Sequence, residues 1–198
     1  MLFYLAPMEG ITGYIVRNAY AHYFPYIDKY FTPFIPAAKK MSKKIKRDLA
    51  AENNEQIRLV PQLIGNRADE FLMMIRQLEE LGFTSVNLNF GCPSGTVVSK
   101  RKGTGFLADP KELEMLLEEV LEKSPLAVSV KTRVGIKDPD EWEALCGVYV
   151  KFPLEELIIH PRLQNDYYSG TPRMETFARA LEQIHVPLCY NGDICSVE

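Results

Sequence analysis

Side chains able to do chemistry recur at one kind of place in this sequence, the point where a short apolar run ends. One run leads into Pro7-Met8-Glu9, and later runs end at Gln62, Asn89, Lys131, His160 and Asn191. The carboxyl ends of parallel strands meet at one edge of a sheet or barrel. Polar groups at six successive ends therefore predict a polar pocket lined by a ring of loops.

Cys92 is a candidate for a chemical role in this pocket. It lies between Gly91 and Pro93, a sequence typical of a loop. A thiol of ordinary pKa, about 8.5, is mostly protonated at neutral pH and can act as a general acid. The alternative is an inert core thiol, which is the expectation for Cys146 and Cys189. The four cysteines form no C-x-x-C pair, so we expect neither a zinc site nor a disulfide scaffold.

Lys131 and Gln62 are candidates for ligand contacts. Lys131 ends a Val-Ser-Val run, where a buried ammonium is costly unless an anion pairs with it; a surface salt bridge is the alternative. Gln62 can both donate and accept hydrogen bonds, and capping a loop is its alternative role.

The elements that carry these residues alternate between strand and helix. Seven near-continuously apolar runs predict parallel strands buried on both faces: Leu2–Ala6, Tyr26–Phe31, Arg58–Ile64, Ser85–Asn89, Ala127–Lys131, Leu157–His160 and Pro187–Tyr190. Helix starts are predicted at Asp109-Pro110, at Asp138-Pro139, after Asn66 and at Thr171-Pro172, with Gly82 ending the helix that follows Asn66.

This alternation predicts an α/β fold, either a (β/α)₈ barrel of the TIM type or an open sheet. No G-x-G-x-x-G turn follows the first strand, which favours the barrel. A full barrel needs about 250 residues, and this chain has 198. We therefore expect residues 1–198 to be one catalytic barrel domain, truncated after the seventh strand.

Composition narrows the class of protein. Hydrophobic residues make up 46% and charged residues 25%, and the net charge is −3. These values exclude disorder and a general nucleic-acid coat, and the amino terminus lacks the features of a signal peptide, so we expect a cytoplasmic protein. Two basic segments, Lys39–Arg47 and Lys100-Arg101-Lys102, are expected on loops after strands, where they could contact RNA phosphates or simply be solvated.

The motifs LAPMEGIT, VPQLIG, NLNFGCP, VKTRVG, HPR and YNGDI, taken together, resemble the tRNA-dihydrouridine synthases. The resemblance runs from residue 2 to about residue 194, and NLNFGCP and NGDI are its most specific parts. It implies an FMN enzyme that reduces uridine in tRNA, with NADPH as reductant. It also implies that Cys92 protonates one end of the uracil C5–C6 bond while the flavin delivers hydride to the other.

The resemblance further implies the roles of individual residues. Pro7, Met8, Glu9, Gln62, Lys131 and His160 would contact FMN, with Lys131 at the anionic edge of the reduced ring, and Asn191, Gly192 and Asp193 would hold its phosphate. Asn89 would bind the target uracil, and Arg133, Arg162, Lys100, Arg101 and Lys102 would meet RNA. No metal is implied.

Two departures and two rival functions accompany this resemblance. The chain has His160-Pro161-Arg162 where the family commonly has His-Gly-Arg, and we expect the family's eighth strand and helical tRNA-binding domain to be missing from these 198 residues. One rival is another FMN barrel that reduces a small molecule. The other is a non-catalytic barrel that binds RNA.

Overall fold

A computed structural model describes residues 1–195, and the strands in this part are all parallel. They are β1 (Tyr4–Leu5), β2 (Lys29–Phe31), β3 (Ile35–Pro36), β4 (Leu59–Val60), β5 (Gln62–Ile64), β6 (Ser85–Phe90), β7 (Ala127–Arg133), β8 (Leu157–His160) and β9 (Leu188–Tyr190). The sheet orders are β1-β2-β4 and β3-β5-β6-β7-β8-β9. Because β3 continues the path of β2 and β5 that of β4, seven successive barrel strands result, as predicted.

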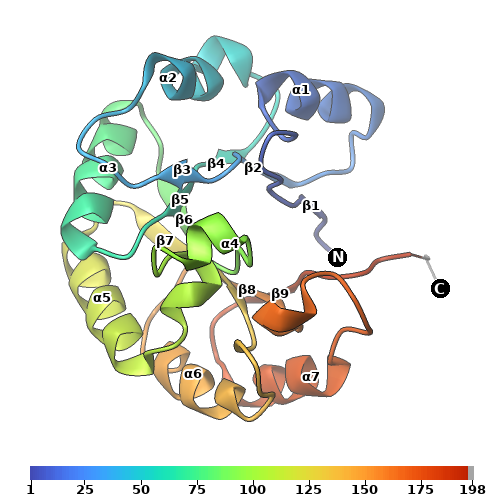
Figure 1. Cartoon of the computed structure of the whole chain (residues 1–198). Coiled ribbons are helices and arrows are strands. Elements are labelled where there is room, and N and C mark those ends of the chain that lie inside the picture. The colour runs from blue at the N-terminus through green and yellow to red at the C-terminus, as the bar shows by residue number, and fades with distance from the viewer. Residues whose placement is uncertain (196–198) are drawn as a thin grey trace.

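The helices form a ring around these strands (Figure 1). They are α1 (Tyr14–Tyr23), α2 (Lys43–Leu49), α3 (Ala68–Glu80), α4 (Gly95–Val98), α5 (Pro110–Lys123), α6 (Glu141–Tyr149) and α7 (Met174–Gln183), with 3₁₀ turns η1 (Ala51–Asn53), η2 (Gly103–Phe106) and η3 (Gln164–Asp166). The ring is open on one side, where β1, β9 and the amino terminus lie. Within residues 1–195, β1 and β9 form no ladder. The fold is a TIM-type β/α barrel that is not closed.

Two helix ends that were predicted from local sequence signals lie where they were expected. Asp109 accepts hydrogen bonds from the backbone N–H groups of Lys111 and Glu112 at the start of α5. Gly82, at φ +87°, follows the last residues of α3 in the left-handed region that favours glycine. Both predictions are confirmed.

Other predicted starts were wrong by two or three residues. The helix predicted at Asp138-Pro139 begins at Glu141, because the Glu141 carboxylate turns back and accepts from the N–H groups of Ile136, Lys137 and Asp138. The helix predicted at Thr171-Pro172 begins at Met174.

The prediction that Lys39–Arg47 is a loop was also wrong, because its second half forms α2. Ser42 caps this helix by accepting from the Ile45 N–H. Leu49 is buried and Ile45 packs against the main core. These tertiary contacts hold a strongly charged segment in a helix.

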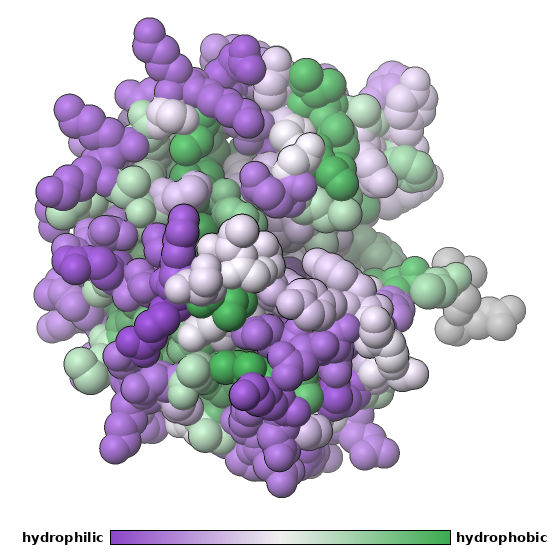
Figure 2. All heavy atoms as spheres, viewed as in Figure 1, coloured by the Kyte–Doolittle hydropathy of each residue, from purple (hydrophilic) through white to green (hydrophobic). Residues whose placement is uncertain are grey.

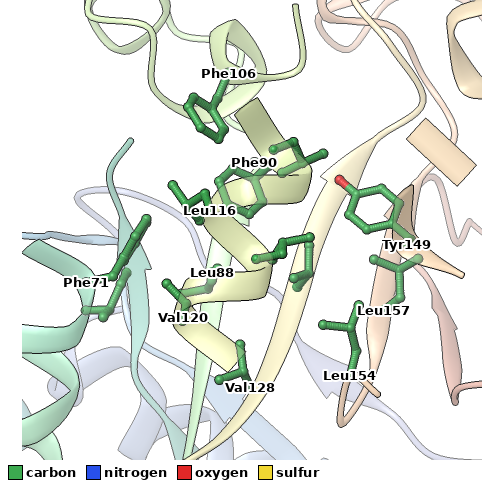
Figure 3. Packing of buried hydrophobic residues seen from close by; sticks show 14 of the residues in the cluster. Phe71, Leu88, Phe90, Phe106, Leu116, Val120, Val128, Tyr149, Leu154 and Leu157 are labelled. Atoms are coloured by element: carbon green, nitrogen blue, oxygen red, sulfur yellow. The ribbon is translucent and has the colours of Figure 1, made fainter. Parts of the chain in front are cut away.

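The main hydrophobic core lies between the sheet and its helices. Leu88 and Phe90 of β6 pack with Phe71 of α3 and with Leu116 and Val120 of α5 (Figure 3). The intervening residues of β6 are Ser85, Asn87 and Asn89, whose side chains face the opposite side of the strand, toward the barrel interior. The expectation of apolar residues on both faces was therefore wrong for β6, whose inner face is polar.

A buried ion pair crosses the amino-terminal end of the barrel. Lys29 Nζ lies 3.0 Å from Glu156 Oε2, and the Tyr4 hydroxyl donates to Glu156 Oε1 at 2.7 Å. Lys29 also lies 4.6 Å from the centre of the Tyr4 ring. These contacts join β1 and β2 to the residue before β8. Separately, the helices described for residues 1–195 are all too short or too polar to cross a membrane.

Candidate functional site

The strand register brings the sequence-predicted residues to one end of the barrel. Asn89 of β6 pairs with Lys131 of β7, and Arg133 of β7 pairs with His160 of β8. On the other side, Gln62 of β5 pairs with Asn87 of β6. The loops that follow these strands therefore lie next to one another, as the sequence predicted.

The Cys92 loop is fixed by hydrogen bonds at both its ends. Asn89 Oδ1 accepts from the backbone N–H groups of Gly91 at 3.0 Å and of Cys92 at 2.9 Å. The Cys92 carbonyl accepts from the N–H and the hydroxyl of Thr104, both at 3.1 Å. A Cβ at Gly103 would lie 2.5 Å from that carbonyl oxygen. Only glycine allows η2 to approach this closely.

The Cys92 thiol lies partly buried at this fixed loop. Burial raises its pKa, and the nearby charges of Arg133 and Lys131 offset only part of that effect. The group is therefore a protonated thiol at neutral pH, which is the form that a proton donor requires.

Lys131 carries an ammonium without an anion beside it. Burial, reinforced by the charge of Arg133, lowers its pKa from the usual 10.5 to about 8. Within residues 1–195, its Nζ has neither a hydrogen bond nor a salt bridge to another side chain. An anionic ligand at this position would relieve that cost. The donor chemistry therefore fits the anionic edge of a reduced flavin.

Gln62 and Asn89 are buried and already hydrogen-bonded to each other. Asn89 Nδ2 donates to Gln62 Oε1 at 2.7 Å, and Gln62 Nε2 donates to Asn87 Oδ1 at 2.8 Å. Gln62 keeps one N–H and one lone pair for a ligand. Asn89 keeps one N–H, because its oxygen holds the Cys92 loop.

His160 is a neutral imidazole. Burial, with the positive charges of Arg133, Lys131 and Arg162, lowers its pKa to about 3. Arg162 Nη1 lies 3.2 Å from His160 Nε2. Because arginine can only donate, Nε2 accepts and the ring proton is on Nδ1.

Arg162 and Arg133 are each only 1% exposed and bind protein groups. The five N–H groups of Arg162 all have partners: His160, the carbonyls of Ser169 and Gly170, and both carboxylate oxygens of Asp193. Arg133 donates to the carbonyls of Gly91 and Leu163. In this arrangement both arginines hold loops in place.

The loop after β9 is anchored rather than free. The Asn191 N–H continues the ladder by donating to the Ile159 carbonyl. Asp193 binds Arg162 at 2.7 and 2.8 Å. Gly192 lies between these two anchors.

The predicted RNA-contacting charges are on the surface. Lys100 and Arg101 are exposed and Lys102 partly so, and Arg101 forms a 2.8 Å salt bridge with Glu112. The six basic residues of Lys39–Arg47 form no salt bridge with any residue that the structure describes. Met8 and Glu9, after β1, are exposed as well.

The sequence argument missed several residues near this site. Tyr168 is exposed, and its ring lies 5.4 Å from the Arg133 guanidinium carbon and 6.3 Å from the His160 ring. Thr104, Asn87 and Ser129 also contribute hydrogen bonds to the site. A period-two reading of polar residues in β6 and β7 could have found Asn87 and Ser129, whereas nothing in the sequence marks Tyr168.

A cavity of about 570 Å³ lies beside this site, between α1 and α2. Its lining includes Ile11, Ile15, Phe34, Lys44 and Arg47. Figure 2 shows apolar atoms gathered over the start of α1, where Ile11 and Ile15 are exposed. The cavity is distinct from the polar cluster around Cys92.

Fold and site together define a parallel β/α barrel with a polar site at the carboxyl ends of its strands. Residues 4–198 match the model of the family described as Dihydrouridine synthase (Dus), and the chain belongs to that family. It is 30% identical to tRNA-dihydrouridine(16) synthase of Pseudomonas putida, over 98% of this chain and 62% of the relative. It is 27% identical to tRNA-dihydrouridine synthase B of Pasteurella multocida, over 98% and 59%.

The chain spans about half to three-fifths of the length of the curated relatives it matches. Among solved structures it resembles a variant of NCR from Zymomonas mobilis, with a TM-score of 0.61 and 11% identity, over 96% of this chain and 74% of that one. That likeness concerns the fold alone.

Proposed function

We propose that residues 1–198 form the catalytic FMN-binding barrel domain of a tRNA-dihydrouridine synthase, which reduces a uridine in tRNA to 5,6-dihydrouridine. One observation carries the proposal. A thiol that burial keeps protonated lies on a fixed loop, beside a strand-end ammonium that has no anion paired with it. Family membership supports the same conclusion. A tRNA substrate would also place the protein in the cytoplasm.

The donor set suits FMN at the carboxyl ends of the strands. Lys131 would hold the anionic edge of the reduced ring, Gln62 its pyrimidine amide, and neutral His160 would donate from Nδ1. The Pro7-Met8-Glu9 loop would border the ring, and the Asn191-Gly192-Asp193 loop would face the phosphate. NADPH is the proposed source of electrons. When bound, reduced FMN supplies hydride to one end of the uracil C5–C6 bond.

The chain's own contribution is a proton at the other end of that bond. Cys92 Sγ–H would donate it, so that hydride and proton together add two hydrogens. The resulting thiolate would lie near the positive charges of Lys131 and Arg133, both of which favour it. Solvent then returns the proton to Cys92.

RNA contacts are assigned to groups that still have capacity to bind. Asn89 would offer its remaining N–H to the uracil, and Lys100, Arg101 and Lys102 would meet phosphates. Each phosphate contact makes binding more sensitive to salt. Arg162 would act by holding loops, because protein groups occupy all five of its N–H donors. Arg133 binds two backbone carbonyls through Nε and Nη1, so it keeps N–H groups that could also meet an RNA phosphate.

The test is the flavin spectrum of the purified protein together with the dihydrouridine content of tRNA. We expect a yellow protein, and we expect loss of dihydrouridine at one tRNA position in a strain that lacks the gene. A colourless protein that cannot be reconstituted with FMN would contradict the cofactor assignment. An unchanged dihydrouridine content in the presence of flavin would instead favour a barrel that reduces a small molecule.

A Cys92→Ala variant tests the role of the thiol. Flavin binding and flavin reduction by NADPH should persist, because neither needs this proton. Uridine reduction should slow by roughly 10²–10⁴-fold, the usual loss for a general acid. Cys195→Ala, at an exposed thiol, is the matched control. Dihydrouridine formation at the parent rate in Cys92→Ala would assign proton donation to another group.

A further inference from the structure

We infer that a one-way chain of hydrogen bonds through the barrel interior orients Asn89 and the Cys92 loop, which makes Ser129 and Asn87 positioning residues of the site. Their role in catalysis rests on the proposed function, whereas the orientation itself does not. Asn87 and Gln62 are the middle members of this chain, and Asn89 is its last side chain before the Cys92 loop. Gln62 and Asn87 are fully buried, and Ser129 and Asn89 nearly so.

The chain runs across three neighbouring strands. Ser129 Oγ donates to the Val86 carbonyl at 3.2 Å and accepts from Asn87 Nδ2 at 2.9 Å. Asn87 Oδ1 accepts from Gln62, whose own oxygen accepts from Asn89. Asn89 Oδ1 then accepts from two backbone N–H groups of the Cys92 loop. Every link is a donor facing an acceptor.

The direction of the chain is set at both ends by backbone groups whose roles cannot change. A backbone N–H can only donate, so Asn89 must present its oxygen to Gly91 and Cys92. Its amide nitrogen then donates to the Gln62 oxygen, so the Gln62 nitrogen must donate to the Asn87 oxygen. The Asn87 nitrogen must in turn donate to the Ser129 hydroxyl oxygen. The Val86 carbonyl, which can only accept, accepts the last hydrogen bond, from the Ser129 hydroxyl. Reversing any one amide would place two donors or two acceptors together in a buried space.

Ser129 is therefore the residue that terminates the chain at its inner end. Without its hydroxyl, the Asn87 amide loses its acceptor, and a buried unsatisfied group costs about 1–3 kcal/mol. Asn87 would then reorient and remove the constraint on Gln62 and Asn89. The consequence would appear at the Cys92 loop, although Ser129 does not touch that loop.

Amide hydrogen exchange on the flavin-free 198-residue chain tests this directly. In Ser129→Ala, exchange at Gly91 and Cys92 should accelerate at least about tenfold relative to Val130, whose N–H donates to the carbonyl of Glu156, the residue before β8. Ser129→Thr, which keeps a hydroxyl, should restore slow exchange. Ser85→Ala is the matched control, because Ser85 is a buried serine of β6 whose hydroxyl takes part in none of these bonds.

Two results would overturn the inference. One is unchanged exchange at Gly91 and Cys92 in Ser129→Ala. The other is an equal acceleration at Val130, which would indicate a general loss of stability. Either result would leave the proposed function standing, since that depends on flavin binding and dihydrouridine formation. Conversely, a chain that binds no flavin could still show the predicted exchange pattern.

Discussion

Lys131 places a positive charge in a site that disfavours it. Its pKa, about 8 in the folded protein, lies below the usual 10.5, so the unfolded chain binds more protons between these two values. The free energy of unfolding therefore rises with pH between about 8 and 10.5, as Lys131 loses its proton. Below pH 8 Lys131 is charged in both states, and the full cost of burying its charge lowers the stability of the fold. Without a ligand, the charged residue destabilises the fold at neutral pH.

We predict that Lys131→Met raises the free energy of unfolding at pH 7 by about 1–3 kcal/mol. The gain should shrink as pH approaches 10, because the parent lysine is then neutral. Urea unfolding at pH 7, 9 and 10 measures it, with Lys123→Met, at an exposed lysine, as control. The same variant should bind reduced FMN more weakly. A Lys131→Met protein less stable than the parent at pH 7 would show that the ammonium has a stabilising partner.

The sequence identified the chemical character of the site residues but not their partners. Cys92, Lys131 and His160 could be located from the ends of apolar runs, because the parallel arrangement gathers such ends. The bonding of Asn89 to the Cys92 loop and of Arg162 to Asp193 could not be found in this way. Those bonds depend on the register between strands and on loop paths that no local pattern encodes.

Close approach of two loops makes Gly103 the most constrained glycine of the site. Its φ is +55°, and a Cβ would meet the Cys92 carbonyl. Gly103→Ala should lower stability by about 1–3 kcal/mol and accelerate alkylation of Cys92. Gly147→Ala, inside α6 with open space around it, should instead stabilise by about 0.5–1 kcal/mol. Thermal unfolding and the rate of iodoacetamide modification distinguish the two; equal effects would contradict the crowding at Gly103.

Helices were predictable where their signals were local. Asp109-Pro110 and Gly82 act through their own turn of backbone, so the sequence placed those ends correctly. Glu141 folds back onto the preceding residues, and α2 forms because Ile45 and Leu49 pack against the core. Both depend on neighbours that a linear pattern does not reveal. The polar inner face of β6 is different, because Ser85, Asn87 and Asn89 alternate with apolar residues in the sequence itself, and a period-two reading would have found them.

The ion pair of Lys29 and Glu156 connects the first strands to the last ones at the amino-terminal end of the barrel. Removing one partner leaves the other charge buried, which costs about 3–5 kcal/mol. We predict this loss for Glu156→Leu, and recovery of most of it in Lys29→Met/Glu156→Leu, both measured by urea unfolding. Glu143→Ala, which breaks the exposed pair with Arg179, should change stability by less than about 1 kcal/mol. If the double variant is as unstable as Glu156→Leu, the loss comes from poor packing of the new side chain and not from the unpaired charge of Lys29.

The ion pair also has a consequence for the order in which the protein is made. Glu156 lies 127 residues after Lys29 in the chain. At typical rates of about 5–20 residues per second, a ribosome needs roughly 6–25 seconds to pass from one to the other. During that interval the nascent β1 and β2 carry a lysine and a tyrosine whose acidic partner does not yet exist. The contacts that join β1 and β2 to the residue before β8 can therefore form only after Glu156 has been synthesised, so the amino-terminal strands complete their packing late.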